Sequence, residues 1–120
     1  MLVAVPLFGD EVSPRFGYAT EVMLAHVEGR KVHSSRRIAV PETGGMQICV
    51  LLISLKPQVV ICGGIRRACQ RMLEHRHITV IWGIIGRAED ALSSYASGKL
   101  KSDQFVCPGR RRFRKGGRGQ

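Results

Sequence analysis

Residues 58–83 read QVVICGGIRRACQRMLEHRHITVIWG, which is the pattern of a strand, a helix and a second strand. Apolar runs at 58–62 and 78–82 predict two buried strands. Between them, residues 65–74 place apolar side chains on one helical face and arginines on the other, which predicts an amphipathic helix. Because such units are joined by right-handed crossovers, we expect the two strands to be parallel in one sheet.

The sequence on either side extends this pattern to a five-stranded sheet. Residues 2–7 (LVAVPL) predict a central strand, apolar on both faces. Residues 18–27 and 32–39 predict two strands of a hairpin that turns at Gly29-Arg30. Helices are predicted at 46–55 and 87–97. The expected element order is βββαβαβα, a mixed α/β sheet of strand order 3-2-1-4-5 with three helices, which is the ribonuclease H-like arrangement.

Length and charge predict one domain with a basic tail. The chain has 120 residues, of which 44% are hydrophobic, enough for one core and too many for a disordered protein. Its net charge is +10, and six of its nineteen basic residues lie between Arg110 and Arg118. We therefore expect a folded domain at 1–100 and a disordered Gly/Arg-rich tail at 101–120. Such a balance favours anionic partners.

The four cysteines show no metal-binding or redox spacing. No CxxC pair occurs. Cys49 and Cys69 fall on apolar helix positions and are expected in the core, whereas Cys107 is expected to be exposed in the tail. The first residues lack a secretory leader, and no apolar run is long enough for a membrane span. We expect a cytoplasmic protein with reduced thiols and no membrane contact.

The predicted topology brings several helix N-termini to one edge of the sheet. All three helices should begin where the first strand ends, beside the loop that carries Arg15. Helix N-termini offer free N–H groups and partial positive charge, and glycines permit close backbone approach. The sequence therefore predicts an anion site at this edge. Its candidate residues are Arg15, Thr43, Gly44, Gly45, Gly63 and Gly64. Each glycine pair taken alone is equally consistent with a simple strand-to-helix turn.

Two further features are candidate metal ligands. Cys62 closes a strand directly before Gly63-Gly64, where helix N-termini and arginines would favour a thiolate able to bind a soft metal. The alternative is that Cys62 is simply a small, buried apolar residue at the end of the strand and binds no metal. Around the Gly29-Arg30 turn, His26 should face His33 across the hairpin, close enough to share a metal. Such a pair is more often a polar strand edge.

Three segments resemble the dinitrogenase iron–molybdenum cofactor biosynthesis family: MLVAVPLFGDEVSPRFGYA, VVICGGI and ITVIWGIIG. The resemblance covers about residues 1–100. It implies a ribonuclease H-like fold and carriage of an anionic metal–sulfur cluster, of the iron–molybdenum or the molybdenum–copper sulfide type found in orange proteins. By position it adds the loop SPRFG, with Ser13, Phe16 and Gly17, to the strand-end Cys62–Gly64. Cluster donor or acceptor proteins would be its partners.

The function expected from these features is non-catalytic binding of a cluster by charge and N–H donors. The main alternative is a nucleic-acid-binding module that uses the basic tail. A ribonuclease H-type nuclease is disfavoured, because two-metal catalysis needs several carboxylates on the sheet and residues 2–7 carry none. An enzyme with Cys62 as nucleophile is disfavoured by the lack of a nearby histidine.

Overall fold

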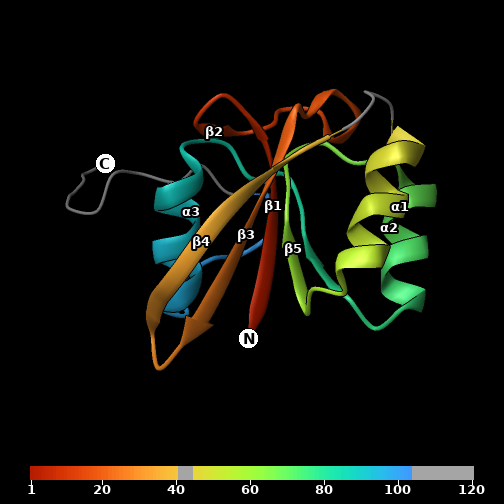
Figure 1. Cartoon of the computed structure of the whole chain (residues 1–120). Helices are drawn as coiled ribbons and strands as arrows, with labels where there is room; N and C mark the ends of the chain where they lie inside the picture. Colours follow the sequence, from red (N-terminus) through yellow and green to blue (C-terminus); the bar gives the residue numbers. More distant parts are fainter. Residues whose placement is uncertain (41–44, 104–120) are drawn as a thin grey trace.

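The protein has a mixed α/β fold in which helices cover both faces of one sheet (Figure 1). The computed structural model describes residues 1–40 and 45–103. Elements follow the order β1 (Leu2–Phe8), β2 (Glu11–Val12), the 3-10 turn η1 (Phe16–Tyr18), β3 (Glu21–Glu28), β4 (Lys31–Ala39), α1 (Gly45–Leu55), β5 (Val59–Ile61), α2 (Arg67–His75), β6 (Thr79–Ile81) and α3 (Ala88–Ala96).

The sheet has six strands, one more than the sequence predicts. Its main path runs β4-β3-β1-β5-β6, and β2 pairs with β1 beside that path. β5 is parallel to β1 and to β6, whereas β3 is antiparallel to β1 and to β4. Glu11–Val12 was expected to be loop, because two residues carry too little periodicity to be recognised as a strand.

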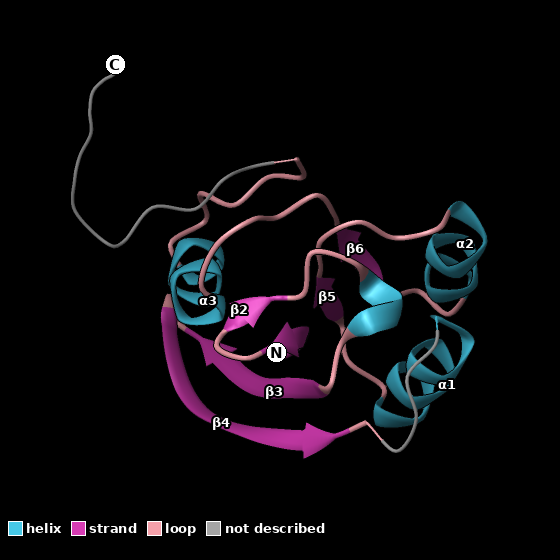
Figure 2. Ribbon diagram, turned by 90° about the horizontal axis from the view of Figure 1, so that it is seen from above, coloured by secondary structure: helices cyan, strands magenta, loops and turns pink. Residues whose placement is uncertain are grey.

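The central strands are apolar on both faces because each face packs against helices. Figure 2 shows α1 and α2 on one side of the sheet and α3 on the other. Alternate β1 residues point to opposite sides, so Ala4 packs in the α1–α2 core and Val5 in the α3 core. Both are fully buried. This explains why residues 2–7 form a continuous apolar run without polar alternation.

Two glycines with positive φ shape the chain locally: Gly29 forms the turn of the β3–β4 hairpin, and Gly83, after β6, allows the C-terminal segment to approach closely. At the β3–β4 turn, Gly29 and Arg30 both have positive φ, 57° and 70°, and the predicted hairpin is present. Gly83 has φ 71°, and a Cβ there would lie 2.9 Å from the Cα of Asp103. The folded body therefore reaches Asp103, three residues past the expected boundary. Residues 104–120, with Cys107, lie outside the described part.

Among the described residues, no helix is long and apolar enough to cross a lipid bilayer.

Candidate functional site

The loop after β2 is tied to the sheet by its own polar groups. Ser13 is completely buried, its N–H donates to the carbonyl of Pro6 at 2.9 Å, and its hydroxyl donates to the carbonyl of Arg15 at 2.6 Å. Phe16 is 2% exposed and packs in the α1–α2 core. Ser13 and Phe16 therefore hold the loop in place, and Arg15 at its rim is exposed.

Gly63 and Gly64 serve mainly to receive this loop. A Cβ on Gly63 would collide with the carbonyl oxygen of Ser13 and lie 2.9 Å from that of Pro14. The Gly64 N–H donates to the Pro14 carbonyl at 2.8 Å, and the Gly64 carbonyl accepts from the Phe16 N–H at 2.7 Å. The Gly64 N–H is thus occupied within the protein. The glycine pair permits close approach of backbone to backbone.

The same contact places three arginines around the start of α2. Arg15 forms an isolated parallel β-bridge with Gly64, two residues before Arg66. Arg66 occupies the N-cap position of α2 and makes no side-chain cap, and Arg67 is the first helical residue. The first turn of α2 contains no acidic residue. We call Arg15, Gly64, Arg66 and Arg67 the arginine site.

Positive charge at the arginine site is not neutralised within the described chain. Arg15, Arg66 and Arg67 are exposed, and none of them forms an ion pair with a carboxylate that the structure describes. The Arg15 guanidinium lies 5.6 Å from the ring centroid of Tyr18, which orients it at the rim. The positive end of the α2 dipole lies among these like charges, so an anion there would be stabilised by all of them.

The three helix N-termini do not all meet at one place as expected, because the sheet separates the start of α3 from the starts of α1 and α2 (Figure 2). α3 lies on the face opposite α1 and α2 (Figure 2). The N–H of Ala88, in its first turn, already donates to the carbonyl of Asp10 at 3.0 Å. α1 begins at Gly45, one residue before the predicted helix start, whereas Thr43 and Gly44 lie outside the described residues. Gly17 is part of η1 and half-buried.

Sequence reasoning overlooked Arg66 and Arg67 as site residues. Both were assigned to the solvent face of the helix, since that helix was expected to start directly after Gly64. Gly64 instead pairs with Arg15 of the loop, and α2 begins at Arg67. The sequence does contain one signal that points to these arginines. No Ser, Thr, Asp or Asn stands directly before the helix, so an arginine occupies the capping position and the first N–H groups of the helix have no side-chain acceptor.

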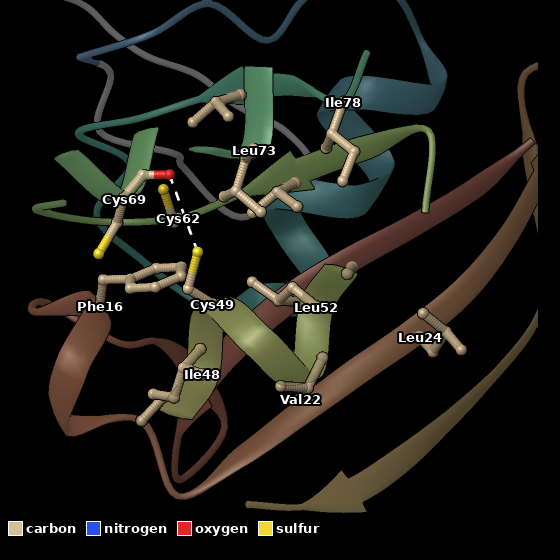
Figure 3. Packing of buried hydrophobic residues seen from close by; sticks show 14 residues of the cluster. Phe16, Val22, Leu24, Ile48, Cys49, Leu52, Cys62, Cys69, Leu73 and Ile78 are labelled. Carbon is tan, nitrogen blue, oxygen red and sulfur yellow. Dashed lines mark hydrogen bonds between the residues drawn. The ribbon is translucent and has the colours of Figure 1, made fainter. Parts of the chain in front are cut away.

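Cys62 does not have the reactivity expected from its position. It is fully buried in the α1–α2 core, where Figure 3 shows its sulfur near Phe16, Cys49 and Cys69. Burial raises the pKa of the Cys62 thiol to about 12, so the side chain stays a neutral thiol at physiological pH. The expectation of a readily formed thiolate is therefore wrong. Cys49 and Cys69 are buried, as expected.

His26 and His33 are not cross-strand partners. His26 pairs with Ser34, and the register shifts between His26 and Val27, so that Val27 pairs with Val32. His33 is the residue left out by this β-bulge, and its Nε2 lies 3.1 Å from the carbonyl oxygen of Glu28. The predicted facing pair is wrong because the bulge adds one residue to β4. Within the described ranges, no cluster of three or more His, Cys, Asp or Glu side chains could hold a metal ion.

Comparison with solved structures identifies relatives of the same fold. The protein PH0822 is 27% identical, with a TM-score of 0.78, and the match covers 86% of this chain and 95% of that one. A putative dinitrogenase from Methanocaldococcus jannaschii is 19% identical, with a TM-score of 0.69 and coverage of 84% and 92%. The apo orange protein of Desulfovibrio gigas is 17% identical, with a TM-score of 0.66 and coverage of 84% and 91%.

No curated protein sequence matches the chain significantly. The family described as dinitrogenase iron-molybdenum cofactor matches residues 1–98. This range includes every element from β1 to α3 and all four residues of the arginine site. The chain belongs to the dinitrogenase iron-molybdenum cofactor family.

Proposed function

We propose that this protein binds and carries an anionic metal–sulfur cluster, without catalysing a reaction, and that the arginine site receives the cluster. The observation that supports this most directly is the group of three exposed arginines at the start of α2, with no described carboxylate paired to them. Membership of the iron–molybdenum cofactor family supports a cluster as the anion. The strand order is compatible with the ribonuclease H-like class, which we propose for the fold.

The binding mode follows from the chemistry of the residues present. In an iron–molybdenum–sulfur or molybdenum–copper sulfide cluster, sulfides complete the metal coordination, so the protein needs to supply only charge and hydrogen-bond donors. Arginine guanidinium groups present several N–H donors in a fixed plane, and the α2 N-terminus adds backbone N–H groups. Cys62 is not a ligand in this proposal, because its buried thiol stays protonated. Release to an acceptor protein would then require no metal–protein bond to break.

The test is reconstitution without air, using tetrathiomolybdate and copper as probes on the full chain. We expect a visible chromophore that stays with the protein through desalting. Replacing both arginines, Arg66→Gln with Arg67→Gln, should weaken uptake about tenfold or more, because each loses charge-assisted hydrogen bonds. Arg71→Gln with Arg76→Gln is the control of equal charge, since both arginines are exposed and lie beyond the first turn of the same helix. It should retain uptake.

Two outcomes would contradict the proposal. One is equal uptake by the double variant and the parent, with both folded by circular dichroism. The other is an absence of any chromophore together with tight, selective binding of an oligonucleotide by residues 1–103. The nucleic-acid alternative predicts instead that oligonucleotide binding depends on the tail and falls steeply with salt.

A further inference from the structure

A groove lies at the other end of the sheet from the arginine site. It runs between the C-terminal end of α1 and the β3–β4 hairpin and has a volume of about 430 Å³. This volume is in the range of small-molecule sites. Its lining residues are Leu2, Leu24, His26, Ser34, Ser35, Arg36, Ser54 and Leu55. None of the residues of the arginine site belongs to it, so the two sites are independent.

The groove combines an apolar floor with a polar rim. Leu24 is 6% exposed, and Leu2 and Leu55 pack partly buried against the same α1–α2 core. Exposed polar side chains of β3 and β4 form the rim, with His26 and Ser34 paired across the strands. The lining residues that the structure describes include no carboxylate. The site therefore offers an apolar surface below one permanent positive charge.

Arg36 and its neighbour Arg37 have opposite environments because successive strand residues point to opposite faces. Arg37 donates to Asp10 at 2.7 Å and to Glu21 at 3.3 Å, which satisfies its charge. Arg36 pairs in register with Leu24 on the groove face and has no ion pair with a described carboxylate. One of two adjacent arginines thus lacks a counterion, and it is the one that lines the groove.

From this arrangement we propose that the groove binds a small amphipathic monocarboxylate, with its apolar body on Leu2, Leu24 and Leu55 and its carboxylate on Arg36. The planar guanidinium matches a carboxylate through two parallel N–H donors. The hydroxyl of Ser34 lies at the same groove for a further hydrogen bond, whereas the Ser54 hydroxyl already donates to the carbonyl of Leu51 at 2.6 Å. A dianion such as a phosphate fits less well, because the groove holds one arginine and borders the negative end of α1.

The probe is octanoate, titrated into the full-length, isotopically labelled chain and followed by amide chemical shifts. We expect saturable shifts confined to the amides of 24–26, 34–36 and 54–55. Octan-1-ol supplies the same apolar body without the charge, and acetate supplies the charge without the body. Both should bind at least about tenfold more weakly than octanoate. Arg36→Gln should weaken octanoate binding about tenfold, whereas Lys31→Gln, a matched charge loss on the same strand outside the groove, should not.

Three results would overturn the inference. The first is the absence of saturable shifts with octanoate. The second is equal binding of octanoate and octan-1-ol, or no effect of Arg36→Gln, which would reduce the groove to an unspecific apolar surface. The third is a shift map centred on residues 13–17 and 64–67, which would assign carboxylate binding to the arginine site. None of these outcomes depends on cluster uptake, so the inference and the proposed function fail separately.

Discussion

Gly63 shows that a glycine after a strand can be required for close approach of the protein's own backbone rather than of a ligand. A glycine pair after a strand resembles the loops that approach a bound phosphate closely. Here the approaching group is the backbone of residues 13–16, and the carbonyl of Ser13 occupies the space where a Cβ would lie. In the proposed function, the binding role therefore falls to the residues on either side of the contact, Arg15 and Arg66. A sequence pattern shows that something comes close to a glycine, but it does not show what.

Cys62 gives a prediction that separates a core residue from a metal ligand. Cys62→Ala should keep chromophore uptake and lower the free energy of unfolding by about 1–2 kcal/mol, the usual cost of shortening a buried side chain. Cys49→Ala, an equally buried site in the same core, is the control and should behave alike. Urea unfolding and reconstitution measure the two effects. Uptake lost only in Cys62→Ala, with the fold retained, would make this sulfur a ligand.

At the scale of elements, Arg37 ties the outer strand to the start of the β1–β2 turn. Arg37 lies on β4, Asp10 lies between β1 and β2, and Glu21 begins β3. The hydrogen bond and the charge of Arg37 hold the pKa of Asp10 below its ordinary value of 3.8. The ionised form is thus the one that stabilises the folded state. Its contribution is present above the ordinary pKa and disappears as the pH falls through the lowered one.

Asp10→Asn should therefore be less stable than the parent near neutral pH. The difference between their melting temperatures should shrink as the pH falls below about 4, where the parent loses the same charge. Glu11→Gln is the control, because Glu11 is exposed and has no ion pair with a described side chain. It should show a smaller difference with pH. A gap between parent and Asp10→Asn that stays constant from pH 7 to pH 3 would contradict the role of this ion pair.

The elements that sequence predicts well are those with long periodic or turn signals. The apolar strand β1, the hairpin at Gly29-Arg30 and the three helices all occur near their expected positions. The errors occur where one residue changes the geometry. The bulge at His33 cancels the expected histidine pair, and pairing of Gly64 with Arg15 delays the start of α2. Both depend on contacts between segments distant in sequence, which periodicity does not contain.

At the scale of the molecule, the packed body includes Ser102 and Asp103, which composition assigns to the tail. The N–H of Asp103 donates to the carbonyl of Trp82 at 2.6 Å, and the N–H of Trp82 donates to the hydroxyl of Ser102 at 3.2 Å. Composition placed the boundary at residue 100, because the polar residues after it bury little apolar surface. The hydrogen bonds to the end of β6 extend the domain without adding to the core.

Two truncations test this boundary. A chain ending at Asp103 should melt close to the full-length temperature, since residues 104–120 contain few apolar side chains to bury. A chain ending at Leu100 should melt several degrees lower, because each lost hydrogen bond contributes about 1 kcal/mol and a domain of this size shifts by about 4–8 °C for that energy. Thermal unfolding by circular dichroism measures both. Equal melting temperatures for the two truncations would show that Ser102 and Asp103 add nothing to the stability of the domain and would support a boundary at residue 100.

Trp82 gives the protein an intrinsic fluorescent probe. It is the single tryptophan of the chain, it is 41% exposed, and its backbone is fixed by Ser102 and Asp103. The next residue, Gly83, donates to the carbonyl of Gly63, so the backbone of Trp82 lies at the end of the sheet where Gly64 pairs with Arg15. A coloured anion arriving there would quench the indole emission by energy transfer. Loading and unloading could then be followed in real time on the native chain, without an attached dye.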